Sequence, residues 1–278
     1  MDQILTLAHS PDADDAFMFY ALAKERVATG GLRFQHVLAD IETLNQSALR
    51  SVYDVTAISF HAYAYLHQSY ALLRCGSSFG EGYGPLVVAR EALKPAELTG
   101  KRIAIPGKMT SAYLLLRLFA GEVETVAVPF DQIPQALASG QAGAGLLIHE
   151  GQLTYGESGL RPVVDLGAWW QEQHGLPVPL GGLAVRRGIE PERVRAIAAA
   201  VEASIRFALE HRADALAHAL QYGRGMSTEL GDRFVGMYVN ELTLDAGARG
   251  QRSIQLLLDR AFEARLIPAR VVVELHPA

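Results

Sequence analysis

The chain has 278 residues, of which 50% are hydrophobic and 20% are charged, and its formal net charge is −5. This composition is typical of a globular protein with a sizeable core, and the acidic balance argues against a nucleic-acid partner. A single cysteine, Cys75, excludes an internal disulfide and a cysteine-based zinc site. No apolar run reaches the roughly 20 residues of a membrane span and no signal-peptide pattern opens the sequence, so we expect a cytoplasmic protein without a membrane partner.

The first part of the chain alternates short apolar runs with helical patterns. The predicted strands cover residues 4–9, 34–38, 55–59 and 71–74, and the predicted helices cover residues 16–24, 41–50 and 60–66. This alternation is typical of a parallel α/β sheet.

A second α/β series follows the segment Gly-Pro-Leu-Val-Val-Ala-Arg at residues 84–90. Its predicted strands cover residues 102–105, 124–128 and 144–148, and its predicted helices cover residues 111–120 and 132–139. A similar Gly-led strand at residues 180–187 closes the series, and the chain is mostly helical from about residue 191 to 266.

Two Gly-led strands that bracket an α/β series predict a double crossover between two lobes. We expect lobe 1 to comprise residues 1–88 and 184–278 and lobe 2 to comprise residues 89–183, with a cleft between them and the crossovers as a hinge. A single larger sheet also fits the pattern. Trp169 and Trp170 are expected to pack between the lobes rather than to line the cleft.

Polar loops follow four of the predicted strands, at the ends where open α/β sheets bind their ligands. The loop at residues 10–15 contains Asp12, Asp14 and Asp15. Carboxylates there favour the positive end of the following helix, which we expect to explain at least two of the three, while Asp15 could orient a substrate hydroxyl. No second acidic cluster or EF-hand spacing accompanies them, so no metal is predicted.

The second and third loops carry hydroxyl groups at the starts of helices. Ser59 stands at a strand-to-helix turn, where it could cap the helix or contact a ligand. Thr110 and Ser111 open a helix after Gly107, and the backbone N–H groups there favour a carboxylate. An ordinary helix cap is the competing interpretation for both loops.

His149 ends the fourth strand, after the apolar run at residues 142–148. Imidazole exchanges protons near neutral pH, so His149 is a candidate general base, although a strand-end histidine can also merely bond a turn. The sequence contains no nucleophile elbow, zinc motif or dinucleotide fingerprint. It therefore predicts acid–base chemistry without a cofactor, such as an elimination or a retro-aldol cleavage.

Seven segments in order resemble the 1,4-dihydroxy-6-naphthoate synthase family of the futalosine pathway to menaquinone. They are residues 10–17 (Ser-Pro-Asp-Ala-Asp-Asp-Ala-Phe), 40–45 (Asp-Ile-Glu-Thr-Leu-Asn), 84–90, 106–113 (Pro-Gly-Lys-Met-Thr-Ser-Ala-Tyr), 147–150 (Leu-Ile-His-Glu), 164–170 (Val-Asp-Leu-Gly-Ala-Trp-Trp), and 238–240 with 243–245 (Tyr-Val-Asn, Thr-Leu-Asp). Each segment is weak alone, but seven in sequence are specific.

The resemblance implies a two-lobed α/β fold like that of type II periplasmic binding proteins. It implies conversion of cyclic dehypoxanthine futalosine to 1,4-dihydroxy-6-naphthoate, with loss of the sugar-derived fragment and without a cofactor. The proton acceptor of the family falls on His149. Its substrate contacts fall on Ala57, Ile58, Ser59, Thr110 and Ser111.

The chain departs from some family members at two places. It has Asp-Ala-Asp-Asp at residues 12–15 where they have Cys-Pro-Asn-Asp, and Thr110-Ser111 where they have two threonines. Both departures keep a carboxylate at Asp15 and two hydroxyl groups, so they bear on contact details rather than on the reaction.

Two other functions fit the same fold. One is chorismate dehydratase of the same pathway, and the other is a cytoplasmic protein that binds a small acid without turning it over. In each case the partner is a small-molecule carboxylate and not a nucleic acid. The sequence leaves a homodimer open.

Overall fold

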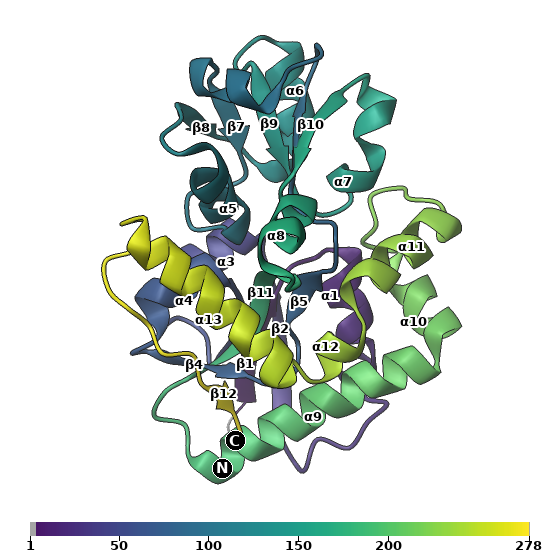
Figure 1. Cartoon of the computed structure of the whole chain (residues 1–278). Coiled ribbons are helices and arrows are strands. Elements are labelled where there is room, and N and C mark those ends of the chain that lie inside the picture. The colour runs from purple at the N-terminus through teal and green to yellow at the C-terminus, as the bar shows by residue number, and fades with distance from the viewer. Residues whose placement is uncertain (1–3, 278) are drawn as a thin grey trace.

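The computed structural model describes residues 4–277, which form two lobes, a larger one below and a smaller one above in Figure 1. In this part of the chain the larger lobe has a sheet of seven strands in the order β12-β4-β11-β3-β1-β2, with β5 paired to β11. The strands are β1 (Ile4–His9), β2 (Arg33–Leu38), β3 (Val55–Ser59), β4 (Tyr70–Leu73), β5 (Ser78–Gly80), β11 (Val178–Arg186) and β12 (Leu275–His276).

This sheet is mixed, so the prediction of a parallel sheet was wrong in part. Strand β1 is parallel to β2 and β3, and β12 is parallel to β4. Strand β11 runs antiparallel to β3, β4 and β5 because it re-enters the lobe from the opposite direction, after the second crossover.

Most helices surround the larger sheet. They are α1 (Ala13–Met18), α2 (Tyr20–Ala23), α3 (Ile41–Ala48), α4 (Phe60–Leu66), α9 (Pro191–Glu210), α10 (Arg212–Ala219), α11 (Thr228–Tyr238), α12 (Glu241–Leu244) and α13 (Gly247–Glu263). The C-terminal helices α9 and α10 pack on α1 and α2, so the end of the chain completes the lobe that its beginning started. The predicted helix at residues 16–24 begins earlier, at Ala13, and is interrupted at Phe19.

The smaller lobe has a sheet of five described strands in the order β10-β6-β9-β7-β8. The strands are β6 (Leu86–Ala89), β7 (Ile103–Ile105), β8 (Thr125–Ala127), β9 (Ala144–Leu147) and β10 (Arg161–Asp165). The helices are α5 (Ser111–Ala120), α6 (Ile133–Ala138), α7 (Gly151–Thr154) and α8 (Leu166–His174), with 3-10 turns at Pro95–Gly100, Phe130–Gln132 and Tyr155–Ser158.

The chain changes sheet between Gly80 and Leu86 and again between Asp165 and Val178. Strand β6 thus pairs entirely within the smaller sheet, and β11 entirely within the larger one. The exact boundaries of the lobes remain a prediction, because the sheets do not define where one lobe ends and the other begins. The predicted lobe 1 comprises residues 1–88 and 184–278, and the predicted lobe 2 comprises residues 89–183.

The first crossover lies directly against the start of α8. A Cβ atom added to Gly167 would lie 2.0 Å from the carbonyl oxygen of Tyr83, and one added to Gly84 would lie 2.8 Å from the Cα of Gly167. Only glycine allows two backbones to approach this closely. The Asp165 carboxylate holds the helix end by accepting bonds from Gly167 N (2.8 Å) and Ala168 N (3.0 Å).

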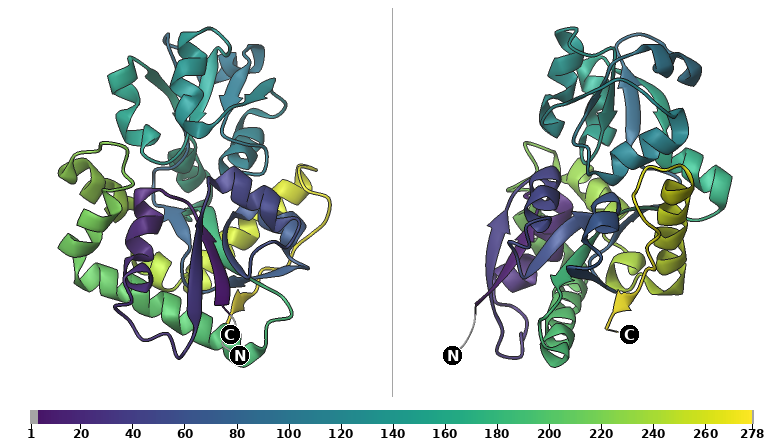
Figure 2. Two further views of the ribbon diagram at one scale, coloured as in Figure 1. Left: turned by 180° about the vertical axis from the view of Figure 1, so that it is seen from behind. Right: turned by 90° about the vertical axis from the view of Figure 1, so that its left-hand side faces the viewer.

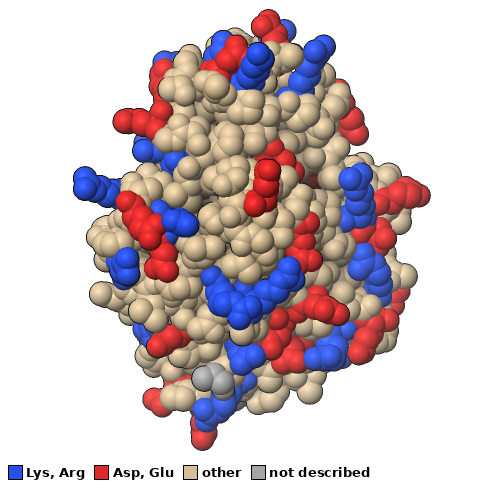
Figure 3. Space-filling view, in the orientation of Figure 1, with Lys and Arg blue, Asp and Glu red and all other residues tan. Residues whose placement is uncertain are grey.

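One apolar cluster connects the two lobes. It includes Ile58 and Phe60 of the larger lobe and Leu115 and Trp170 of the smaller lobe. Trp170 is fully buried, whereas Trp169 is partly buried against Phe119. Both described chain ends, Ile4 and Pro277, lie at the far end of the larger lobe, away from the smaller one (Figures 1 and 2). Acidic and basic side chains are mixed over the face seen in Figure 3.

Candidate functional site

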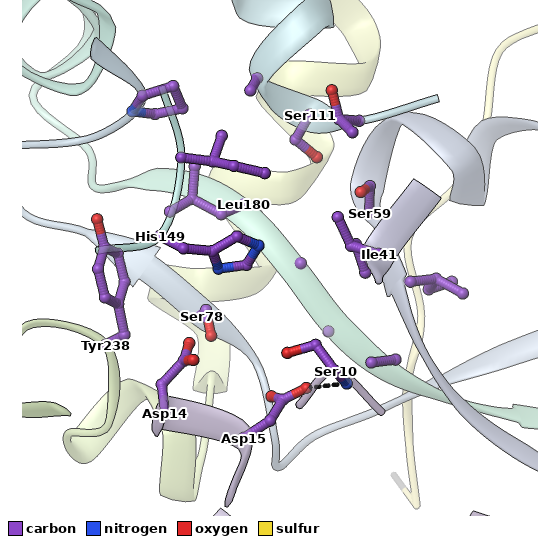
Figure 4. A pocket seen from close by; sticks show the side chains of 18 of the residues that line it. Ser10, Asp14, Asp15, Ile41, Ser59, Ser78, Ser111, His149, Leu180 and Tyr238 are labelled. Carbon is purple, nitrogen blue, oxygen red and sulfur yellow. Dashed lines mark hydrogen bonds between the residues drawn. The ribbon is translucent and has the colours of Figure 1, made fainter. Parts of the chain in front are cut away.

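A cavity lies between the lobes, with about 760 Å³ of empty space that includes its open mouth. Strand ends of both lobes line it, at the place where open α/β sheets bind their ligands. The seven residues singled out from the sequence all face this cavity: Asp15, Ala57, Ile58, Ser59, Thr110, Ser111 and His149. Figure 4 shows His149 projecting into it, with Asp14 and Asp15 on one side and Ser59 and Ser111 across the space.

His149 follows β9 with a left-handed backbone (φ +52°), a conformation that few residues other than glycine adopt. Its side chain is 17% exposed, and its Nε2 lies 3.2 Å from Oδ2 of Asp12. Burial lowers the pKa of His149, but the nearby carboxylates, led by Asp12 and Asp14, outweigh this effect and raise the pKa above its usual value. The imidazole therefore has the position and the charge environment of a proton acceptor.

Two buried carboxyl groups of the loop before α1 share the cavity with His149. Burial and the neighbouring Asp14 raise the pKa of Asp15 to about 8, and Ser10 N donates to its Oδ2 at 2.7 Å. Burial raises the pKa of Asp14 to about 6, against the opposing effect of His149. The raised pKa favours the protonated form of Asp15, in which this side chain can donate a hydrogen bond to a ligand as well as accept one.

Ser59 is held by a residue of a neighbouring helix rather than by its own. Its N–H donates to Oδ1 of Asn45 (2.9 Å), and Nδ2 of Asn45 donates to its hydroxyl (3.0 Å). Its side chain makes no capping bond to α4. The buried Asn45 thus fixes the direction in which Ser59 faces the cavity.

The two hydroxyl residues at the start of α5 differ in their bonding. Thr110 caps the helix, accepting from Tyr113 N (3.1 Å) and donating to the carbonyl of Gly107 (2.9 Å). The Ser111 hydroxyl accepts from His61 N of the larger lobe at 3.3 Å, which leaves its proton available to a ligand. Thr110 is therefore an ordinary helix cap, and Ser111 is the better candidate for a ligand contact.

Further polar contacts link the lobes around the cavity. Met109 N donates to Glu42 Oε2 at 3.0 Å, and the Tyr238 hydroxyl lies 2.7 Å from the side-chain amide of Gln152. Arg224, on the loop between α10 and α11, donates to carboxylates of both lobes, Asp12 and Glu150. The structure thus shows the cleft with its lobes in contact.

Sequence reasoning missed Gln152, Arg224 and Tyr238 as residues of the site region. Gln152 and Tyr238 line the cavity, and Arg224 lies beside it. Tyr238 belongs to one of the segments that carry the family resemblance, and that segment was the available signal. Arg224 lies in a stretch with no strand end or helix cap to mark it.

A second cavity shares Ser10 with the first, and its lining includes His9, His36 and His218. His9 is 4% exposed, and its Nε2 lies 3.0 Å from Nδ1 of His36. Burial, together with the neighbouring His36, lowers the pKa of His9 to about 3. The folded protein therefore holds His9 neutral at all ordinary pH values.

This cluster makes the protein sensitive to acid. Below pH 6.5 the unfolded chain binds a proton at residue 9 that the folded protein does not bind until about pH 3, so stability falls as the pH falls through this window. Compared with His9→Gln, the wild type is expected to lose about 2–3 kcal/mol more between pH 6.5 and 4.5. Urea unfolding at several pH values measures this; Asp14 and Asp15, whose raised pKa values act in the opposite direction, are common to both proteins. Parallel pH profiles would contradict the assignment.

Two general properties complete the description. Among residues 4–277, no group of three or more His, Cys, Asp or Glu side chains is placed to hold a metal ion. Over the same residues, none of the helices has both the length and the apolar character needed to cross a bilayer.

Comparison with solved structures identifies the fold. A protein of Archaeoglobus fulgidus superimposes with a TM-score of 0.91 at 46% identity, covering 95% of this chain and 98% of that one. The alkanesulfonate-binding protein SsuA of Xanthomonas axonopodis pv. citri, bound to MOPS, gives a TM-score of 0.74 at 15% identity, covering 97% and 96% of the two chains. At that identity the likeness shows the fold alone, and it confirms the predicted periplasmic-binding-protein-like architecture.

Comparison of sequences identifies the family. The model of a family described as menaquinone biosynthesis matches residues 5–263. The 1,4-dihydroxy-6-naphthoate synthase of Thermus thermophilus is 42% identical over 267 residues, covering 96% of this chain and 97% of the relative. That of Streptomyces coelicolor is 38% identical over 271 residues, covering 95% of each. The chain therefore belongs to the menaquinone-biosynthesis family, and these two synthases confirm the resemblance that the seven segments indicated.

Proposed function

We propose that this protein converts cyclic dehypoxanthine futalosine to 1,4-dihydroxy-6-naphthoate as a cytoplasmic carbon–carbon lyase without a cofactor. The observation that carries the proposal is His149, a histidine surrounded by carboxylates in a cavity that residues of both lobes line. The names of the two synthases support the choice of product, 1,4-dihydroxy-6-naphthoate.

In this proposal His149 starts the reaction by removing a proton from the substrate. The proton comes from a hydroxyl group of the sugar-derived fragment, and its O–H electron pair forms a carbonyl group there as the carbon–carbon bond breaks. The electron pair of the broken bond remains on the naphthoate part, which takes up a proton. A general base contributes about 10²- to 10⁴-fold to the rate of such a step.

The remaining cavity residues bind the substrate. The substrate carboxylate lies at the start of α5, where Ser111 and the free backbone N–H groups of a ten-residue helix favour a negative charge. Ser59, with the adjoining Ala57 and Ile58, contacts the ring system. Asp15 contacts a hydroxyl of the sugar-derived part.

One incubation experiment separates the candidate functions. The purified protein is mixed with cyclic dehypoxanthine futalosine and, separately, with chorismate, and the products are followed by chromatography. Formation of 1,4-dihydroxy-6-naphthoate supports the proposal, whereas dehydration of chorismate would assign the sister enzyme of the pathway. Tight binding of a small acid without turnover of either compound would assign a binding protein.

Replacing both Thr110 and Ser111 with alanine is expected to raise KM. Of the single variants, Ser111→Ala accounts for most of the change, about tenfold or more, because it removes a hydrogen bond to a charged group. Thr110→Ala mainly removes a helix cap, at a cost of about 1 kcal/mol of stability. Steady-state kinetics and thermal unfolding of the three variants measure both effects. An unchanged KM in the double variant would mean that both residues only cap the helix.

A further inference from the structure

The base proposed above has a carboxylate partner that comes from the opposite lobe. His149 lies at the end of β9 in the smaller lobe, and Asp12 immediately precedes α1 in the larger lobe. The distance between Nε2 of His149 and Oδ2 of Asp12 is 3.2 Å, and the Asp12 side chain is 1% exposed. A carboxylate this deeply buried is costly unless it serves to pair a charge or a proton.

The second oxygen of Asp12 is fixed by Arg224. Nη1 of Arg224 donates to Oδ1 of Asp12 at 2.9 Å and also to Glu150, the residue next to His149. The guanidinium lies over the ring of Phe130 of the smaller lobe, 4.6 Å from its centroid. Although Asp12 precedes α1, its side chain makes no capping bond to that helix, so helix capping does not explain its position.

The two ring nitrogens of His149 have different surroundings. Nε2 is buried from solvent and lies close to Asp12. The orientation of the two groups does not yet make this contact a hydrogen bond. Nδ1 is not a buried atom, and within residues 4–277 it has no hydrogen-bond partner. Since His149 lines the cavity and Nε2 is turned to Asp12, Nδ1 is the nitrogen left for a substrate to reach.

We propose that Asp12 is a positioning residue of the reaction, which holds a proton on Nε2 of His149 and thereby makes Nδ1 the proton acceptor. The proposal rests on the role of His149 in the proposed function. Because the partners belong to different lobes, the base is complete only when the lobes are in contact.

The proposed step balances as a single proton transfer. The substrate proton moves to the lone pair of Nδ1, its bonding pair stays on the substrate, and Nε2 keeps its own proton. The resulting imidazolium faces the Asp12 carboxylate at once, so the new positive charge does not have to form unpaired in a buried site. When the lobes separate, Asp12 withdraws and the histidine loses this support.

Several other charged groups face His149, and each contributes to its titration. Asp14 and Asp15 from the larger lobe and Glu150 from the smaller lobe favour the protonated ring, as Asp12 does. Arg224 is the cation of this group, and its interactions are with Asp12 and Glu150. Among the carboxylates, Asp12 has the largest effect on His149, and therefore its removal is the informative change.

The first test compares single-turnover rates and their pH dependence. Asp12→Asn is expected to lower the rate about 100-fold or more, because an amide N–H facing Nε2 places the ring proton on Nδ1, the wrong nitrogen. In Asp12→Ala the acidic limb of the pH profile is expected to move toward lower pH by about one unit or more, since the histidine loses a nearby negative charge. KM is expected to change little in either variant.

Asp54→Asn is the matched control. Asp54 is also a carboxylate paired with an arginine of the larger lobe, since Arg186 Nη2 lies 2.6 Å from its Oδ1, but it does not line the cavity. This variant is expected to lose stability while keeping the wild-type rate and pH profile. If the Asp12 variants behave in the same way, with altered stability only, then Asp12 is structural and the proposal is wrong.

The second test uses the wild-type protein, so it remains valid even if the Asp12 variants do not fold. ¹⁵N NMR of histidine-labelled wild-type protein, with the His149 signals assigned by their loss in His149→Asn, reports which nitrogen carries the proton. A neutral ring protonated on Nε2 supports the proposal, and a ring protonated on Nδ1 overturns it. Failure of the proposed function itself is distinguishable, because His149→Asn would then turn over substrate at the wild-type rate.

Discussion

Replacement of His149 with alanine or asparagine is expected to leave the protein folded and to lower the single-turnover rate by about 10²- to 10⁴-fold. The histidine is the proton acceptor of the proposed reaction. The neighbouring Asp15 does not take its place, because burial and Asp14 raise its pKa to about 8 and so favour its protonated form. Asparagine is the better of the two variants, because it accepts the left-handed backbone at this position more readily than alanine does.

A histidine far from the cleft provides the control for this experiment. His211 stacks on Phe207 with 3.9 Å between the ring centroids, and it does not line the cavity. The variant His211→Ala is expected to keep the wild-type rate. A wild-type rate in His149→Asn, together with a normal circular dichroism spectrum, would refute the assignment of the base.

Replacement of Trp170 with alanine is expected to cost about 3–5 kcal/mol of unfolding free energy, the usual range for the loss of a large buried aromatic side chain. Trp170 is fully buried in the apolar cluster that joins the lobes, where its ring lies 4.2 Å from that of His174 between centroids. Its loss leaves a cavity that the surrounding helices and strands cannot fill. Urea unfolding followed by circular dichroism measures the difference.

The neighbouring Trp169 offers a matched comparison. It is only partly buried, and its ring packs edge-on against Phe119 at 5.3 Å between centroids. Trp169→Ala is therefore expected to cost about 1–2 kcal/mol, clearly less than Trp170→Ala. Equal losses in the two variants would show that burial between the lobes is not the source of the effect.

Elements with a strong local pattern could be predicted from the sequence alone. The predicted bounds 55–59, 60–66 and 111–120 are those of β3, α4 and α5. Each of these elements has an apolar run or an amphipathic pattern with a clear start, such as Thr110 before α5. In these three elements the tertiary packing favours the same secondary structure as the local sequence does, so the sequence pattern is enough to predict them.

Elements whose existence depends on distant partners could not be predicted. Strand β12 has two residues and forms only because β4 offers it an edge, and β5 has three residues paired to β11. Strand β10 contains a proline, begins with exposed residues and is paired with β6 through an irregular register. In all three cases the stabilising hydrogen bonds come from residues far away in the sequence.

The residues of the candidate site also fall into two groups, those marked by a local sequence feature and those that depend on distant partners. Ser59 and His149 lie at the ends of strands and Ser111 lies at the start of a helix, and these local features marked them. Arg224 and Asp12 are 212 residues apart, and no local pattern relates them. Their pairing depends on how the C-terminal helices return to the first lobe and on the contact between the lobes, and neither can be deduced from the sequence around each residue.

The location of the chain ends has a practical consequence. Both described ends belong to the larger lobe and lie at its far side (Figures 1 and 2), whereas residues of both lobes line the cavity. A tag, a surface linker or a fused neighbour attached at either end is held by the lobe that contains most of the chain. Such an attachment lies away from the smaller lobe and from the cavity. The molecule is thus well suited to immobilisation or to fusion with an enzyme that uses its product.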